Sequence, residues 1–298
     1  MATIHLNRFC FGAFLLILFT AQPALLVHSK HLHPAKWPSF KNLEGSQKGL
    51  TAKGIQDVKN YLRTYEYLED NNIVNCDNDH FDDSLEIALK KFQVFYKLDV
   101  TGKLDSGTIK QMNTPRCGIS DKDLTTVGNV LRYSFFPGLP RWPLATKSHL
   151  LYSLDVITNA PAVSLEIMRY VSTEAFNQWA SVTSFTFEET AGDIGGDLYL
   201  GFMPFDGPHK LIAYSYSPPN GTLHFDVADK FSADEPPAKT DFDFIGVALH
   251  EIGHLLGLQH STEESAIMYA YITPGVNKHS LSQDDIDGIH TLYSLPPP

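Results

Sequence analysis

The stretch HEIGHLLGLQH, residues 250–260, decides which fold and which chemistry this chain can have. His250 and His254 are four residues apart, so on a helix they lie on one face, one turn from each other. This spacing allows two imidazole nitrogens to bind one metal ion at about 2.0–2.1 Å. Glu251 points about 100° away from His250 around the helix. It would lie near the metal without being a ligand, which suits a general base in metal-dependent hydrolysis.

The second half of the stretch supplies a third ligand. Gly257 can adopt a positive φ and end the helix, and the turn that follows can bring His260 back toward the helix. Three protein ligands leave a fourth position open, which distinguishes a catalytic zinc from a structural one. We therefore expect His250, His254 and His260 to bind one catalytic Zn²⁺, with Glu251 as the catalytic residue.

The helix that carries this motif, from about residue 241 to 256, has a separate packing face. Ile245, Leu249, Ile252 and Leu256 recur at helical spacing and form one apolar stripe. By the 100° rule this stripe lies opposite the two histidines. One face should therefore pack in the core while the other presents the histidines to a cleft.

The composition is that of a globular, acidic protein. Hydrophobic residues make up 43% of the 298 residues and aromatic residues 12%, which suffices for cores in about two domains. The formal net charge of -11 argues against nucleic acid or an anionic membrane as a partner.

The N-terminus has the pattern of a secretory signal peptide, residues 1–29. Arg8 precedes an apolar run, residues 9–21, that is too short to span a membrane comfortably. Small residues near Ala24 or Ser29 offer cleavage sites. A retained anchor is the alternative, but we expect a secreted chain with no membrane anchor after signal removal and no lipid-anchor signal at the C-terminus.

Three cysteines are present, and Cys10 would leave with the signal peptide. Cys76 and Cys117 could form one disulfide, or one of them could be a free thiol with a function. Cys117 follows Arg116 on a loop. The positive charge of Arg116 would lower the pKa of the Cys117 thiol, which would make this residue a credible metal ligand. Asn220 begins an Asn-Gly-Thr glycosylation acceptor in a turn-rich stretch.

The spacing of apolar residues divides the chain into a small all-α unit and a mixed unit. Residues 31–47 resemble a linker, and residues 121–129 an exposed connector that a protease can cut. Helices are expected at 51–68, 82–98 and 105–112, and later at 161–180 and from Ser282 through 293. Strands are expected at 149–155, 185–188, 197–202, 211–216 and 223–226.

These features resemble the matrixin branch of the metzincins, the matrix metalloproteinases, and especially their plant members. The zinc motif and the loop PRCGISD, residues 115–121, carry the resemblance, together with LSQDDIDG at 281–288 and RWP at 141–143. It implies an α+β fold, with a twisted five-stranded mixed sheet plus three helices (127–298) after an α-helical prodomain (30–126). Met268 matches the family's Met-turn beneath the zinc. No C-terminal propeller domain is apparent.

The resemblance implies a zinc-dependent endopeptidase made as a latent zymogen. Cys117 would be the fourth zinc ligand in the latent form only, and Arg116 and Asp121 would pair to hold the switch loop. Glu251 would activate the water, and an extended peptide substrate would lie beside the strand at 211–216. An activating protease would remove the prodomain. The protein would act as a monomer, in the extracellular space or plant cell wall (apoplast). The new N-terminus would then pair with Asp284.

The chain departs from the family pattern at the second zinc site. The family's His-x-Asp segment is missing, and Tyr214 stands where a third ligand is expected, which leaves His224 alone. Because one imidazole cannot hold a site that needs four ligands, no structural zinc is expected. Ser120 and Ala270 replace usual prolines in the switch loop and beside the specificity pocket.

Calcium is a more plausible second metal. Asp206, Asp226 and Asp229 match the family's carboxylate ligands, with carbonyls available from Gly207 and Pro208. Hard oxygen ligands of this kind are what Ca²⁺ requires. The alternative is that these are solvated aspartates in turns.

Two further questions stay open from the sequence. Gly246, one turn before His250, either leaves a deep specificity pocket for a large apolar substrate residue or allows close packing of the helix. The competing functions are a non-catalytic interaction protein on the same fold and, for the N-terminal helices, a module that binds cell-wall glycans. The intact Glu251 and the three histidines favour an enzyme, and the switch loop favours a prodomain.

Overall fold

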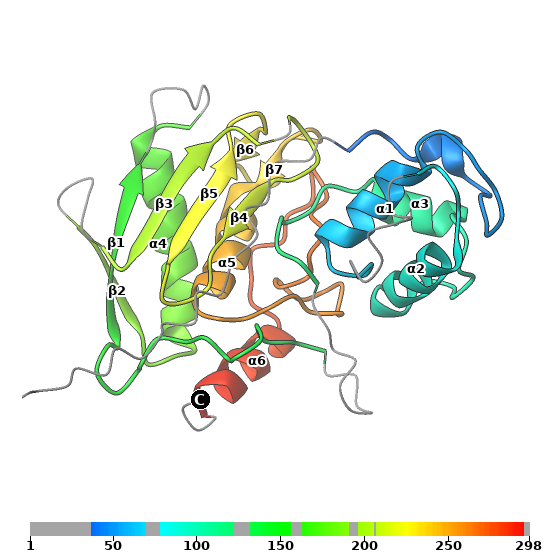
Figure 1. Ribbon diagram of the computed structural model, residues 1–298. Helices are drawn as coiled ribbons and strands as arrows, with labels where there is room; N and C mark the ends of the chain where they lie inside the picture. The colour runs from blue at the N-terminus through cyan, green and yellow to red at the C-terminus, as the bar shows by residue number, and fades with distance from the viewer. Residues whose placement is uncertain are drawn as a thin grey trace, which may run out of the picture. The chain divides into compact units, whose positions relative to one another are not determined.

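A five-stranded mixed sheet forms one layer of the C-terminal part of the chain (Figure 1). Its strand order is β2-β1-β3-β5-β4, in which β4 alone runs antiparallel to its neighbour. The strands are β1 (His149–Asp155), β2 (Thr186–Glu189), β3 (Leu198–Met203), β4 (Ala213–Ser215) and β5 (Thr222–Asp226). The computed structural model describes residues 37–69, 78–121, 132–155, 163–190, 196–205 and 207–294.

Three helices accompany the sheet: α4 (Leu165–Ser181), α5 (Phe244–Leu255) and α6 (Gln283–Ser294). Helices α4 and α5 pack against one another, with α4 against β1 and β2 and α5 against β4 and β5. The apolar stripe of α5 is buried, as its spacing predicts, but the opposite face with His250 and His254 is buried as well and does not face an open cleft. The α+β fold, with a five-stranded mixed sheet and three helices, is therefore confirmed.

Several local signals predict these elements well. Ser282 and Asp285 form the predicted capping box before α6. Helix α4 begins later than the predicted residue 161, because Ser164 caps it by accepting a hydrogen bond from the backbone N–H of Ile167. The predicted range for β1 is confirmed. Two short paired strands, β6 (Phe231–Ser232) and β7 (Phe242–Asp243), were not predicted, because two residues are too few to show alternation.

The N-terminal helices have their own aromatic core. They are α1 (Ile55–Thr64), α2 (Asp83–Phe95) and α3 (Ser106–Met112), preceded by the 3₁₀ helix η1 (Lys41–Leu43). The prediction of a linker over residues 31–47 is wrong for its described part. Phe40 and Leu43 are buried in this core, and Phe40 contacts Tyr61 edge to face, so this segment is packed rather than free.

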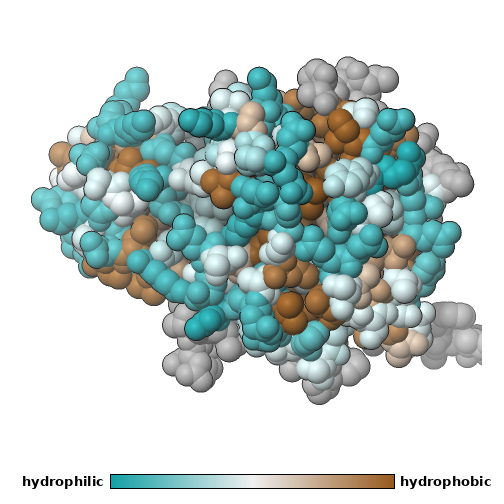
Figure 2. All heavy atoms as spheres, turned by 180° about the vertical axis from the view of Figure 1, so that it is seen from behind, coloured by the Kyte–Doolittle hydropathy of each residue, from teal (hydrophilic) through white to brown (hydrophobic). Residues whose placement is uncertain are grey.

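The surface has no broad apolar face on the side seen in Figure 2, where hydrophobic side chains form small patches among hydrophilic ones. Within the described ranges, no helix has both the length and the apolar character needed to cross a membrane. Several predicted features lie outside the described residues: the signal peptide, Cys10, Cys76, Pro161 and the connector around residue 127.

Candidate active site

Helix α5 presents His250 and His254 from a rigid position. Asp243 caps its N-terminus by accepting a hydrogen bond from the backbone N–H of Gly246. The indole N–H of Trp179, in α4, donates to the backbone carbonyl of Leu249 at 2.9 Å. At the other end of the helix Gly257 has φ = 102°, so the chain turns there as predicted and leads His260 back toward the helix.

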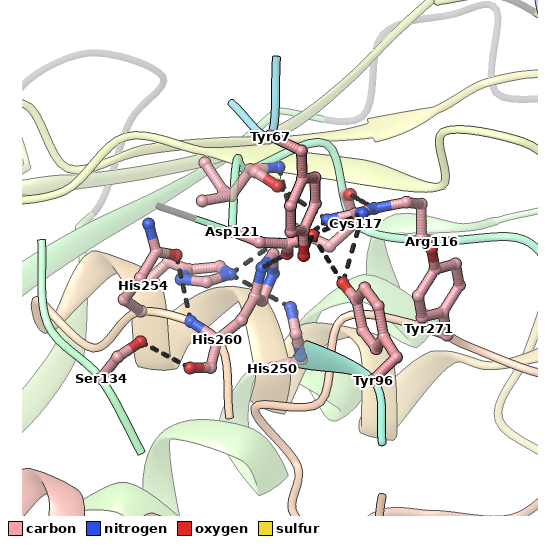
Figure 3. Close-up of polar contacts among 12 residues, drawn as sticks. Tyr67, Tyr96, Arg116, Cys117, Asp121, Ser134, His250, His254, His260 and Tyr271 are labelled. Atoms are coloured by element: carbon pink, nitrogen blue, oxygen red, sulfur yellow. Dashed lines mark hydrogen bonds and ion pairs between the residues drawn. The ribbon is translucent and has the colours of Figure 1, made fainter. Parts of the chain in front are cut away.

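Each of the three histidines is oriented by an oxygen at its Nδ1 (Figure 3). The Nδ1 of His250 lies 2.7 Å from the carbonyl of Ile267, and that of His254 lies 2.8 Å from the carbonyl of Leu258. The Nδ1 of His260 lies 2.8 Å from a carboxylate oxygen of Asp121. An Nδ1–H bonded in this way leaves Nε2 as the nitrogen with a free lone pair, the arrangement seen when imidazole binds a metal.

The donor atoms are arranged so that one ion could bind all of them. The ligand atoms of Cys117, His250, His254 and His260 all lie within 4.8 Å of one another. His254 Nε2 is 3.1 Å from His250 Nε2 and 3.5 Å from the sulfur of Cys117. Tetrahedral ligands of zinc at about 2.0–2.3 Å are separated by roughly 3.3–3.6 Å. His260 Nε2 is buried and has no hydrogen-bond partner. A metal ion bound to its lone pair would satisfy this nitrogen.

Burial also keeps the histidines in the form that binds metals. It lowers the pKa of His250 and of His254 well below the ordinary value, and the neighbouring histidines lower both further. Burial lowers the pKa of His260 as well, against the opposing effect of Asp121. The neutral rings are therefore favoured, and the donor set of three imidazoles and a thiol fits zinc.

Glu251 lies beside this group and is fully buried. Its Oε2 accepts a hydrogen bond from the hydroxyl of Ser215 at 2.5 Å, whereas its Oε1 is buried and has no partner. Burial raises the pKa of Glu251 to about 7, although the nearby hydroxyl of Ser215 and thiol of Cys117 act in the opposite direction. A carboxyl group whose pKa lies near neutral pH can both accept and return a proton.

Comparison with known proteins identifies the fold around these residues. The sequence matches the matrixin family over residues 141–294. The chain belongs to the matrixin family. Residues 51–112 match a putative peptidoglycan binding domain.

Plant metalloendoproteinases resemble the chain over most of its length. It is 35% identical to Metalloendoproteinase 1 of Glycine max, over 96% of this chain and 96% of that protein. It is 39% identical to Metalloendoproteinase 5-MMP of Arabidopsis thaliana, over 86% of this chain and 76% of that protein. Stromelysin-1 of Mus musculus is 36% identical over 70% of this chain and 43% of that protein. This matrixin is thus a zinc metalloendopeptidase with a helical N-terminal unit.

The loop at residues 115–121, called the switch loop below, lies along the edge of the matrixin sheet. Arg116 bonds through its backbone N–H to the carbonyl of Lys210 and through its carbonyl to the N–H of Ile212, on the approach to β4. On the other side, the backbone N–H of Cys117 donates to the carbonyl of Ala270 at 2.9 Å. The loop therefore occupies the edge that we expected to bind an extended substrate. Of the two alternatives for Cys117, the structure shows the free thiol.

Asp121 is the centre of a buried polar network that holds this loop (Figure 3). Arg116 donates to both of its carboxylate oxygens, at 2.7 and 2.9 Å. Tyr67 and Tyr96, from the helical unit, donate to the same carboxylate at 2.8 and 2.6 Å. Burial alone would raise the pKa of Asp121, but Arg116 and His260 outweigh it and hold this pKa well below its ordinary value.

The sequence predicts the pairing of Arg116 with Asp121 but not the rest of this network. The guanidinium of Arg116 lies 3.6 Å from the ring centroid of Tyr65 and 5.1 Å from that of Tyr271. The sequence also does not predict the contact between Asp121 and His260. This contact joins the switch loop directly to a predicted zinc ligand. No local pattern could have indicated it, because 139 positions separate the two residues.

We expect Asp121→Asn to destabilise the full-length protein by about 3–5 kcal/mol, because it leaves the buried guanidinium of Arg116 without its counter-charge. Urea unfolding of the two proteins measures this. Asp83→Asn is the control, since Asp83 forms an exposed pair with Lys48 and should cost less than about 1 kcal/mol. Equal effects of the two substitutions would contradict the structural role of the network.

Met268 packs directly beneath the zinc-binding helix. A Cβ at Gly253 would lie 2.3 Å from the Met268 sulfur, so the close approach requires glycine there. The carboxylate of Asp285 accepts hydrogen bonds from the backbone N–H groups of Ile267 and Met268, at 2.9 and 3.0 Å. Asp285 thus fixes the backbone at Ile267 and Met268, a role beyond its predicted helix cap. Asp284 accepts a hydrogen bond from the hydroxyl of Ser261 at 2.6 Å.

The predicted calcium ligands are partly described. Asp226 is buried; its Oδ1 accepts hydrogen bonds from the N–H groups of Phe205 and Ala228, and its Oδ2 has no partner. Burial raises the pKa of Asp226, against the effect of these backbone bonds. Asp229 is buried and accepts a hydrogen bond from the N–H of His209 at 2.6 Å. Asp206 lies outside the described residues.

Two other predictions concern residues around the sheet edge. Tyr214 pairs with His224 across β4 and β5, and the ring of His224 lies 5.5 Å from that of Tyr199. Among the described residues, Cys117 and the three histidines form the one group of three or more His, Cys, Asp or Glu ligands close enough to share an ion. Gly246 is closely packed, because a Cβ there would lie 2.3 Å from the Lys278 carbonyl oxygen. This favours the packing explanation over the deep pocket.

Proposed function

We propose that this matrixin is a secreted zinc endopeptidase made as a latent zymogen, with Cys117 as the fourth ligand of the catalytic zinc. The observation that carries the proposal is the close group of four ligand atoms, three from the matched matrixin region and one from the switch loop. Tyr67 and Tyr96 support a prodomain role for the helical unit rather than a glycan-binding one, because they hold Asp121 in that loop.

Removal of the switch loop would free both the metal and the edge strand. Zinc, when bound, supplies a Lewis acid that polarises the scissile carbonyl and makes a water molecule acidic near neutral pH. The N–H of Ile212 and the carbonyls of Lys210 and Ala213, which now bind the loop, would pair with an extended peptide. Glu251 would receive the proton of the attacking water at Oε1 and return it to the leaving amine.

A chelator assay tests the proposed activity. The purified protein, after cleavage near residue 127, should hydrolyse a fluorogenic peptide, and 1,10-phenanthroline should abolish that hydrolysis. Stoichiometric Zn²⁺ should restore it, because the ligand set favours zinc. A folded protein that holds zinc and cleaves no peptide from a broad library would contradict the proposal.

We also propose a calcium site at Asp206, Asp226 and Asp229, supported by the buried, unpartnered Oδ2 of Asp226. Millimolar Ca²⁺ should raise Tm by about 2–4 °C for each kcal/mol of binding free energy. Asp226→Asn should remove the shift, and an equal concentration of Mg²⁺ should not reproduce it. A shift of the same size in Asp226→Asn would contradict the site.

The remaining proposals concern processing and location. We infer that the chain is exported to the extracellular space or cell wall, that an unidentified protease activates it, and that it acts as a monomer without a structural zinc. Asn220 is exposed in the turn before β5, where a glycan could be attached. Mass spectrometry of the secreted chain tests signal cleavage near Ala24 or Ser29 and a glycan at Asn220. A retained leader would contradict secretion by this route.

A further inference from the structure

Ser215 makes a contact with Glu251 that no feature of the zinc motif predicts. Ser215 is the last residue of β4 and is fully buried. Its hydroxyl donates to Oε2 of Glu251 at 2.5 Å, within a site where both groups are shielded from solvent. A hydrogen bond from a hydroxyl to a buried carboxylate is charge-assisted, and the low local dielectric favours it.

The two partners are held by different elements. Ser215 is fixed by its pairing with Leu223 in the antiparallel ladder of β4 and β5. Glu251 extends from α5, one residue after the first zinc-binding histidine. The Glu251 side chain has several rotatable bonds, which the helix backbone does not fix. The contact with Ser215 in the sheet restricts their rotation. Both residues lie within the matrixin region, residues 141–294, so both remain in the chain after removal of the prodomain.

The contact also distinguishes the two carboxylate oxygens. Oε2 is bound to Ser215, whereas Oε1 is buried without a hydrogen-bond partner. Oε1 is therefore the oxygen available to a reacting water. A general base must lie within hydrogen-bond reach of the proton that it removes, and small misplacements are costly.

We propose that Ser215 is a positioning residue that holds the Glu251 carboxylate by Oε2 and directs Oε1 to the attacking water. This rests on the proposed role of Glu251 as the general base. The hydroxyl of Ser215 bonds to Glu251, whereas the edge groups expected to pair with a peptide are backbone groups of Lys210, Ile212 and Ala213. Loss of the hydroxyl should therefore slow the chemical step more than it weakens substrate binding.

The kinetic test uses the full-length protein activated by a mercurial that caps Cys117. Ser215→Ala should lower kcat about tenfold, with KM changed less than about twofold and zinc content unchanged. Ser153→Ala is the matched control, because Ser153 is equally buried in β1 but far from the motif, and kcat should stay unchanged. Unchanged kcat in Ser215→Ala, or an equal fall in kcat in Ser153→Ala, would overturn the inference.

A second measurement does not depend on activity. In the latent protein, Ser215→Ala should lower Tm, because a buried carboxylate loses its donor. In a Glu251→Leu background the same change should leave Tm unchanged or raise it, because the hydroxyl has then lost its partner. Equal loss of Tm in both backgrounds would overturn the pairing. If Glu251→Gln is itself active, the proposed role of Glu251 as the general base fails; if only Ser215→Ala is without effect, this inference alone fails.

Discussion

In the activated protein, Glu251→Gln should lower kcat by about 10²–10⁴-fold while zinc content and KM stay close to those of the wild type. Gln has nearly the shape of Glu, so packing should be kept, and its amide oxygen can still accept the hydrogen bond from Ser215. An amide cannot take up the proton of the attacking water. The loss should therefore fall on the chemical step. Steady-state hydrolysis of a fluorogenic peptide measures it.

Glu174→Gln is a suitable control, because Glu174 is exposed on α4 and makes no contact with the motif. Its activity should equal that of the wild type. Glu251→Gln with more than about a tenth of wild-type kcat would mean that another group moves the proton. Zinc analysis of each preparation excludes the trivial explanation that the substitution expels the metal.

Cys117→Ser should have the second large effect, by releasing latency without any cleavage of the chain. A serine hydroxyl is a poor zinc ligand compared with a thiolate, so water can compete for the fourth position. We expect peptide hydrolysis by the full-length protein to rise on the order of 100-fold, which corresponds to about 2.8 kcal/mol. The initial rate should be measured before any self-processing appears on a gel.

Cys76→Ser provides the matched control, because it removes a thiol from the same unit and should leave the protein latent. If Cys117→Ser were as inactive as the wild type before cleavage, the backbone hydrogen bonds of the switch loop would be the true block. Those backbone bonds join Arg116 with Lys210 and Ile212, and Cys117 with Ala270, and the substitution changes none of the atoms that form them.

The helices, the strands and the three histidines could be predicted because their signals are local. His250 and His254 share one helix, and the stripe that includes Ile245 and Ile252 packs in the core. The burial of Phe40 and Leu43 could not be predicted in this way. Two apolar residues in a segment rich in Pro, His and Lys form no periodic pattern, and their partners come from distant helices.

The parts of the site that the sequence could not predict are contacts between distant segments. The bond between Asp121 and His260 spans 139 positions, and that between Ser215 and Glu251 spans 36. Gly246 could be assigned to packing only once the carbonyl of Lys278 was seen beside it. In each case the residue type allows several roles, and only the fold selects among them.

The central claim, a zinc ion bound by three imidazoles and one thiolate in the latent protein, is tested most directly by X-ray absorption at the zinc edge. The full-length protein should show one sulfur at about 2.3 Å and three nitrogens at about 2.0–2.1 Å. After activation the sulfur should be replaced by a light atom. A latent protein whose zinc has only nitrogen and oxygen neighbours, or that contains no zinc, would contradict this account.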